Sequence, residues 1–379
     1  MNIIFKPNNN IPIKINENEF IFKKDKQYLV NYYFIESILQ FGNVISFDQK
    51  QYNINIDLSN KSVLFVRSFG LGDILFLTPV LKIIKEKYPN CKIGFATVKY
   101  QHELLSMIKE VDEIIEYPID LDIIKNYVFH FFVSGLVENK LSENQDENIY
   151  KIYLKHLGLK DEEITEDLLR PYLTNLKIPE VDHNTNIIGI HPFSGNPVRQ
   201  LNLNLVSLLC KKLIDKNYKI NLFSNTIEYN EYKYIFDDNR IKWVIENGNY
   251  FSNTITNLLK CKTVISTDSF ITHLCQVLNV NCICIYGPFP AISRVSGYKN
   301  ITIIDSNPDC RCYLHSKTKC LKKRTSSPCL NIDTDLLVKI IENKDDDYEF
   351  DKIKIYDPII SKFNFTNLEN GDEQNEKEK

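Results

Sequence analysis

The chain has 379 residues, a formal net charge of −3, and a composition that is 43% hydrophobic. This length suits about two domains with real cores, and the small charge gives no sign of nucleic-acid binding. No apolar run reaches the roughly 18 residues of a membrane-spanning helix, and the first ten residues lack the pattern of a secretory signal. We therefore expect a cytoplasmic protein without a nucleic-acid partner.

Residues 1–60 are polar and rich in Asn and Lys. Two short stretches, 11–15 and 52–56, alternate like strands, and residues 32–39 are typical of a short helix. The pattern predicts a small N-terminal extension appended to the rest of the chain.

From residue 61 to 182, strand-like and helix-like segments alternate. The expected strands are the runs at 62–67, 92–98, 113–117 and 127–133. The expected helices are 73–88 and 101–109, and Thr78-Pro79 inside the first predicts a late start or a kink. A strand, a helix and a strand joined by short connections form the βαβ unit of a parallel sheet.

A second alternation of the same kind spans residues 183–345, and the polar residues 346–379 are expected to be a partly disordered tail. The expected strands are 187–190, 218–223, 262–266 and 282–286, and the expected helices are 203–216, 251–259, 269–278 and 334–343. This predicts an α/β protein with two Rossmann-like domains facing a central cleft. In such sheets, ligands bind beyond the carboxyl ends of the strands.

The loop after the first of these strands reads Ser68-Phe-Gly-Leu-Gly-Asp73. Gly70 and Gly72 allow a tight turn and the close approach of a ligand, but neither a third glycine nor a Walker lysine completes a nucleotide fingerprint. Asp73 is either a helix N-cap or a carboxylate that faces the cleft, and both interpretations stay open here. If Asp73 lies at a helix N-terminus, the helix dipole is expected to keep the pKa of its carboxyl group low.

Two loops of the second half are suited to anions. In residues 191–200, Ser194 and Arg199 stand between a strand and a helix and could hold phosphate oxygens. The alternative is an ordinary turn rich in Pro and Gly. In residues 266–273, Asp268 and Ser269 stand at a helix start and are either anion-site residues or caps. His273, one turn later, is either at the site or a packed core residue.

Together, these loops resemble the family 9 glycosyltransferases, the ADP-heptose:lipopolysaccharide heptosyltransferases, over roughly residues 61–340. The resemblance is carried by Val66-Arg67-Ser68-Phe69-Gly70-Leu71-Gly72-Asp73 with Thr78-Pro79, by Asp268-Ser269 with Thr272-His273-Leu274, by Gly287-Pro288, and by late cysteines up to Cys329-Leu330. It implies a GT-B fold and the inverting transfer of a sugar, in that family a heptose from ADP-heptose, to a hydroxyl of a glycolipid or glycan. No catalytic metal is implied.

Carried over residue by residue, the resemblance assigns a role to each candidate. Asp73 would be the general base, on an acceptor-side loop with Arg67, Gly70 and Gly72. The implied donor-binding residues are Ser194, Arg199, Asp268, Ser269 and His273, with Glu228 or Glu231 at the ribose hydroxyls.

The chain also departs from the family. Phe270 stands where the family usually has Gly, Arg199 where it often has Lys, and Leu201 where it has Trp. Phe270 favours an alternative function, a catalytically inactive sugar-nucleotide-binding protein. The N-terminal extension resembles instead the heptosyltransferases that modify autotransporter adhesins, so a protein hydroxyl is the alternative acceptor.

Six of the ten cysteines are scattered through apolar segments, where a thiol acts as a small hydrophobe. The other four lie within twenty residues: Cys310, Cys312, Cys320 and Cys329. Four thiolates can bind a structural zinc or iron ion, and four reduced thiols in a surface loop are the alternative. Basic residues between them could contact an anionic acceptor or the inner membrane face.

Overall fold

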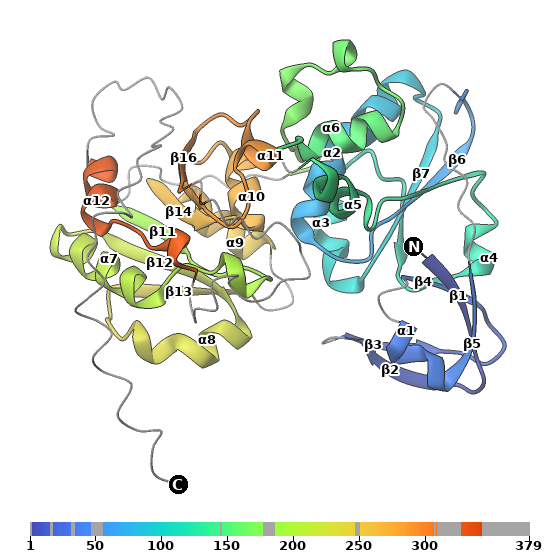
Figure 1. Cartoon of the computed structure of the whole chain (residues 1–379), viewed down its shortest axis with the longest axis horizontal. Coiled ribbons are helices and arrows are strands. Elements are labelled where there is room, and N and C mark those ends of the chain that lie inside the picture. The colour runs from blue at the N-terminus through green and yellow to red at the C-terminus, as the bar shows by residue number, and fades with distance from the viewer. Residues whose placement is uncertain are drawn as a thin grey trace, which may run out of the picture.

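The computed structural model describes residues 2–15, 18–31, 35–46, 56–144, 146–176, 186–246, 251–306, 308 and 327–342. These residues form two parallel sheets, one antiparallel four-stranded sheet and a two-stranded hairpin. In Figure 1 the strands of the second half lie on the left and those of the first half on the right. The expected strand at 52–56, apart from its last residue, and the expected tail lie outside the described residues.

The first parallel sheet has the order β10-β6-β7-β8. Its strands are β6 (Ser62–Val66), β7 (Lys92–Thr97), β8 (Glu113–Glu116) and β10 (Phe129–Phe132), and its helices are α2 (Leu71–Lys87), α3 (His102–Ser106), α4 (Leu121–Ile124), α5 (Leu136–Glu143) and α6 (Ile149–His156). The expected strands are therefore confirmed within a few residues. Because β6 lies between β7 and β10, the chain connections diverge at β6, and this is where a crevice forms.

Helix α2 does not start late, so that part of the sequence prediction is wrong. It begins at Leu71 and continues through Pro79 to Lys87. Pro79 cannot donate to the carbonyl of Leu75, and the hydroxyl of Thr78 donates to that oxygen instead, at 2.8 Å. A side-chain donor thus replaces the missing backbone donor, and the helix continues through Pro79 without ending there.

The second sheet has six parallel strands in the order β13-β12-β11-β14-β15-β16. These are β11 (Ile187–His191), β12 (Lys219–Asn225), β13 (Ile241–Glu246), β14 (Thr263–Thr267), β15 (Cys282–Tyr286) and β16 (Ile301–Asp305), with helices α7 (Leu203–Asp215), α8 (Thr226–Tyr232), α9 (Phe251–Leu259), α10 (Phe270–Leu278), α11 (Ile292–Val295) and α12 (Thr334–Glu342). This is the doubly wound Rossmann order. It places the crevice beyond the ends of β11 and β14.

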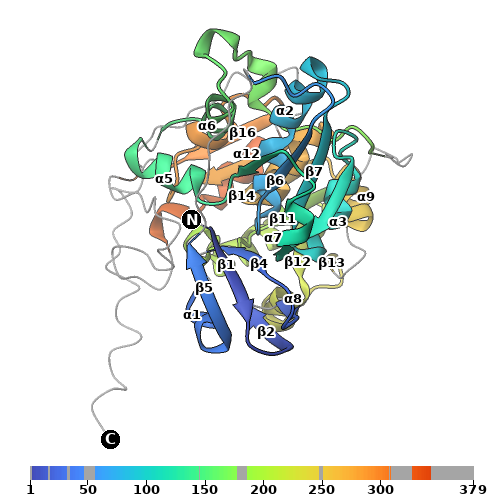
Figure 2. The ribbon, with the colours of Figure 1, turned by 90° about the vertical axis from the view of Figure 1, so that its right-hand side faces the viewer.

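The N-terminal residues form a sheet that is joined to the first half. The antiparallel sheet has the order β5-β1-β4-β9, from β1 (Asn2–Pro7), β4 (Tyr28–Asn31), β5 (Gly42–Ser46) and β9 (Ile119–Asp120). The hairpin β2 (Ile11–Ile15) and β3 (Asn18–Phe22) and the short helix α1 (Ile35–Ile38) complete this region. Figure 2 shows it below the first parallel sheet. Nothing in the sequence signalled the pairing with β9.

The alternation of side chains along β6 explains how that sheet is covered on both faces. Val63 and Phe65 point to one face and pack in the core that contains α2. Leu64 and Val66 point to the other face and pack with buried N-terminal side chains such as Phe5. The N-terminal sheet therefore covers one face of the first parallel sheet.

The two halves also share a buried apolar core, because side chains from both parallel sheets belong to one contiguous cluster. Helix α2 contacts α10, and α6 contacts α11. The ring of Phe76 on α2 packs edge-on against His273 of α10, with 4.6 Å between ring centroids. In the described part of the chain, no helix is both long and apolar enough to span a membrane.

Candidate functional site

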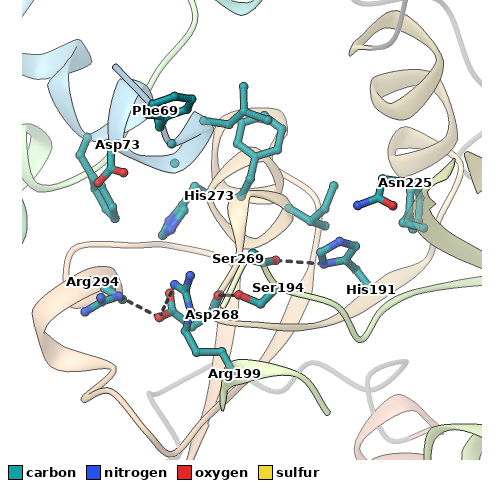
Figure 3. Close-up of a pocket in the computed structure, with 18 of the residues that line it drawn as sticks. Phe69, Asp73, His191, Ser194, Arg199, Asn225, Asp268, Ser269, His273 and Arg294 are labelled. Atoms are coloured by element: carbon teal, nitrogen blue, oxygen red, sulfur yellow. Dashed lines mark hydrogen bonds and ion pairs between the residues drawn. The ribbon is translucent and has the colours of Figure 1, made fainter. Parts of the chain in front are cut away.

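A cavity of about 440 Å³ lies among the loops that follow the strands of both parallel sheets (Figure 3). It brings together every candidate residue that the sequence placed on the three loops and at the end of β12: Arg67, Gly70, Gly72, Asp73, Ser194, Arg199, Glu228, Asp268, Ser269 and His273. Glu231, the alternative to Glu228, is exposed and does not line the cavity.

Arg67 organises the side of the cavity that belongs to the first half. Its Nη2 donates to Asp73 at 2.7 Å and to Glu138 at 3.2 Å, and its Nε donates to the carbonyl of Phe69 at 2.9 Å. The Arg67 residue is only 7% exposed. Two carboxylates therefore share one buried nitrogen. Glu138, on α5, was missed in the sequence because it stands in no motif and is 65 residues from Asp73.

The structure contradicts the interpretation of Asp73 as an N-cap. The N-cap of α2 is Gly70, and no side chain caps the helix there. Asp73 is the third residue of the helix, and its carboxylate turns back to Arg67. The backbone N–H of Asp73 donates to the carbonyl of Gly70 at 3.1 Å.

The expected low pKa of Asp73 is also wrong, because its pKa lies above the usual value for an aspartate. Burial in the cavity raises the pKa, and the charge of Glu138 adds to this effect. The charge of Arg67 opposes both but does not overcome them. About a quarter of the Asp73 side chain is still exposed to the cavity. A partly accessible carboxylate with a raised pKa is a stronger base than an ordinary one.

Asp268 organises the other side of the cavity, at the end of β14. The same oxygen, Oδ2, accepts from Arg199 at 3.1 Å and from Arg294 at 2.9 Å. Burial alone would raise the pKa of Asp268, but the two guanidinium groups hold it below the usual value. The ring of Phe289 lies under both cations, 4.6 Å from Arg294 and 5.6 Å from Arg199.

Arg294 was missed in the sequence because it lies on the short helix α11, in a segment without a motif. It is only 2% exposed, whereas the Arg199 side chain is 19% exposed. The Nε atom of Arg199 is buried and has no hydrogen-bond partner in the described part of the chain. Arg199 therefore keeps an unused donor beside the cavity.

The loop after β11 meets the start of α10. Ser269 is the N-cap position of that helix, but its hydroxyl makes no capping bond. It lies 3.0 Å from Nδ1 of His191 and 3.1 Å from the hydroxyl of Ser266. Ser194 donates to the carbonyl of Asp268 at 3.4 Å. Burial lowers the pKa of His191 to about 3, so its imidazole is neutral near pH 7.

Glu228 lies where β12 ends and α8 begins. Its carboxylate accepts the backbone N–H of Asn225 at 2.8 Å, and the amide oxygen of Asn225 accepts the N–H of Glu228 in return. Burial raises the pKa of Glu228. Beside it, the hydroxyl of Ser224 is buried and has no hydrogen-bond partner among the described residues. This end of the cavity therefore offers two polar groups to a ligand.

Phe270 also lines the cavity, and its ring packs edge-on against Phe251 at 5.5 Å. Of the four late cysteines, only Cys329 is described, and it lies against Gly287. Cys310, Cys312 and Cys320 lie outside the described residues. Within the described ranges, no group of three His, Cys, Asp or Glu side chains could hold a metal.

No family model matches the sequence, and no curated protein matches it. Several solved structures do match. A family 9 glycosyltransferase from Veillonella parvula is 13% identical, with a TM-score of 0.55 over 76% of this chain and 98% of that one. The ADP-heptose lipopolysaccharide heptosyltransferase II of E. coli is 15% identical, with a TM-score of 0.54 over 75% and 99%.

The iron-containing dodecameric glycosyltransferase TibC from enterotoxigenic E. coli is 9% identical, with a TM-score of 0.55 over 90% of each chain. A second structure of TibC is a complex with ADP-D-beta-D-heptose, and it matches with a TM-score of 0.56. The expected resemblance to family 9 glycosyltransferases is confirmed at the level of the fold. The chain is an α/β protein whose parallel sheets resemble those of GT-B glycosyltransferases.

Proposed function

We propose that this chain is an inverting glycosyltransferase with two Rossmann-like domains around a central cleft. In this proposal it transfers a heptose from ADP-heptose to a hydroxyl acceptor. The observation that carries the proposal is the two-sided cavity. One side holds Asp73, a partly exposed carboxylate with a raised pKa, and the other holds two arginines that pair with Asp268, just before α10.

The second-half side of the cavity would bind the nucleotide diphosphate. Arg199 has an unused Nε donor, and α10 presents its N-terminus at Ser269. Helix N-termini and guanidinium groups are the usual partners of phosphate oxygens. Glu228 would accept a ribose hydroxyl at the end of β12. The TibC complex with ADP-heptose supports this choice of donor.

The first-half side would hold the acceptor. In an inverting transfer, the acceptor hydroxyl attacks the anomeric carbon from the face opposite the departing diphosphate and gives its proton to a base. Asp73 would be that base, because its carboxylate reaches the cavity and its pKa is raised. Arg67 would orient it, and Gly70 would leave the space that its carboxylate occupies, while Gly72 would let the acceptor approach the backbone.

A protein hydroxyl is the second candidate acceptor, beside a glycolipid or glycan. The alignment with TibC covers 90% of this chain, whereas the other two glycosyltransferases cover 76% and 75%. The N-terminal extension resembles that of heptosyltransferases that act on protein hydroxyls, and the wider alignment with TibC agrees with this resemblance.

A structural metal is part of the proposal. Cys310, Cys312, Cys320 and Cys329 would hold one iron or zinc ion, since thiolates suit both. The iron in TibC favours iron. Cys329 lies beside Gly287, which follows β15, so the metal would tie the late loop to the second sheet and not to the reacting atoms.

The test is turnover of a panel of nucleotide sugars by the purified full chain. We expect slow hydrolysis of ADP-heptose that releases ADP, with the ADP- and UDP-hexoses much slower. Tight binding of ADP-heptose without hydrolysis or transfer would favour the inactive sugar-nucleotide-binding protein. No binding of any nucleotide sugar would overturn both functions.

A further inference from the structure

Three buried side chains form a line of hydrogen bonds across the contact between the two halves. Nδ1 of His273 on α10 lies 2.7 Å from the hydroxyl of Tyr298, and that hydroxyl lies 2.6 Å from the hydroxyl of Tyr150 on α6. His273 is 3% exposed, Tyr298 6% and Tyr150 0%. Neither hydroxyl can exchange its partner for bulk water, so each of the two hydroxyl hydrogens needs an acceptor within the line.

Two arrangements of the hydrogens satisfy these distances. In the first, Tyr150 donates to Tyr298, and Tyr298 donates to Nδ1 of His273. In the second, Nδ1–H donates to Tyr298, and Tyr298 donates to Tyr150. The second leaves the hydrogen of Tyr150 without an acceptor, because the described residues offer its hydroxyl no partner except Tyr298. A buried donor without a partner is disfavoured, so the first arrangement is preferred.

We infer that Tyr298 is a positioning residue that fixes His273 as the tautomer with its hydrogen on Nε2, and so makes the ring a hydrogen-bond donor to the cavity. Burial lowers the pKa of His273 to about 4, so near pH 7 the ring is neutral and carries a single hydrogen. When Tyr298 donates to Nδ1, that hydrogen must be on Nε2.

The edge of the ring that carries Cδ2 and Nε2 lies beside Gly72, which lines the cavity together with His273. A β-carbon added to Gly72 would lie 3.2 Å from Cδ2 and 3.6 Å from Nε2, so only a glycine leaves space beside this edge of the ring. His273 lines the cavity with Asp73 and Asp268, and Figure 3 shows the imidazole between them. No hydrogen bond joins Nε2 to an atom of the described residues.

The expected acceptor of this hydrogen is an oxygen of the nucleotide diphosphate, and here the inference rests on the proposed function. The same part of the cavity contains the cations Arg199 and Arg294, which suit an anion. As a fixed donor, His273 cannot serve as the general base, so the inference separates its role from that of Asp73.

The experiment compares Tyr298→Phe with Tyr150→Phe in protein labelled with ¹⁵N at histidine. Each variant loses one hydroxyl and the same Tyr–Tyr hydrogen bond at the same buried contact. Only Tyr298→Phe also removes the donor to Nδ1. In Tyr150→Phe, Tyr298 can satisfy its own hydrogen only by donating to Nδ1, so the tautomer is retained. Tyr150→Phe is therefore a matched control for packing.

The ¹⁵N shifts of the ring distinguish a protonated from a bare nitrogen, and His273→Gln identifies the His273 signals. We expect Nε2–H in the wild type and in Tyr150→Phe, and a mixture of tautomers in Tyr298→Phe. ADP affinity, measured by calorimetry, should fall roughly 3- to 10-fold in Tyr298→Phe and stay near wild type in Tyr150→Phe.

Nδ1–H in the wild type, or equal tautomer populations in both variants, would overturn the inference. The NMR result needs no activity, so it stands even if every nucleotide sugar fails to react and the proposed function falls. If the tautomers behave as expected but ADP affinity is equal in both variants, the diphosphate is not the acceptor and this part of the inference is wrong.

Discussion

The carboxylate of Asp73 occupies the space that a β-carbon on Gly70 would take. Gly70 also has a φ of 97°, in a region that L-residues with a side chain rarely adopt. Gly70 is therefore required for two reasons. Its backbone adopts a positive φ, and a side chain there would collide with the Asp73 carboxylate that Arg67 binds. This relationship ties the double-glycine loop directly to the proposed base.

Gly70→Ala should accordingly displace Asp73 and strain the loop. We expect a loss of about 1–3 kcal/mol in the free energy of unfolding, together with a large loss of transfer. Gly195→Ala is the control, because Gly195 also lines the cavity but a β-carbon there would meet no atom within 4 Å. Thermal melts and initial rates measure both effects. Equal behaviour of the two variants would contradict the requirement for Gly70.

Asp73→Asn should abolish most transfer without unfolding the protein. Its raised pKa means that ionising Asp73 does not stabilise the fold at neutral pH, and Arg67 keeps its bond to Glu138. We expect a melting temperature and ADP affinity near wild type, and transfer reduced on the order of 10²–10⁴-fold. Near-normal transfer would show that Asp73 is not the base.

Glu138→Gln should move the pH dependence of transfer. The negative charge of Glu138 disfavours ionisation of Asp73 and so raises its pKa. Removing that charge lowers the pKa, so Asp73 becomes ionised at lower pH and the acid limb of the rate profile shifts to lower pH. Glu86→Gln is the control. Glu86 lies on α2, the helix that carries Asp73, but it is exposed near the other end of that helix and pairs with Lys82. An acid limb that stays in place, or moves to higher pH, would contradict this account.

Arg199→Ala should weaken ADP binding by about 1.5–3 kcal/mol, the range for a hydrogen bond to a charged group. The fold should tolerate the change, because Arg294 still pairs with the buried Asp268. Arg294→Ala should destabilise the protein more, by about 1–3 kcal/mol, since its pair with Asp268 is almost fully buried and Arg199, which still pairs with Asp268, compensates only part of the loss. Calorimetry and melting separate the two outcomes. Unchanged ADP affinity in Arg199→Ala would show that Arg199 does not bind the donor.

Metal analysis of the purified chain should find about one iron or zinc ion per molecule. Cys310→Ser or Cys329→Ser should lower that content and the melting temperature together, because metal binding is coupled to local folding. Cys210→Ser is the control, as Cys210 is buried in the core of the second sheet, and it should change stability while the metal content stays constant. A metal-free protein with normal melting would leave the four cysteines as plain thiols.

The sequence determined the local elements and most of the candidate site. Apolar runs and helical periodicity depend on neighbouring residues only, so β6, β7, β11, β14 and α9 were predicted within a residue or two. The positions of the loops that follow the strands could also be predicted, because parallel strands end at one edge of their sheet. Residues as distant as Gly70 and Ser269 could therefore be named as candidates for one cavity.

The tertiary structure alone decided what surrounds those candidates. Glu138 and Arg294 reach the cavity from helices without a motif, and β9 pairs with β4 although Tyr28 and its partner Asp120 are 92 positions apart in the chain. The pKa of Asp73 depends on the burial and charges that these distant segments impose, which is why a local helix-end argument gave the wrong direction. The hydrogen bonds that join Tyr298 to His273 and to Tyr150 likewise form only because the two halves meet there, where α11 contacts α6.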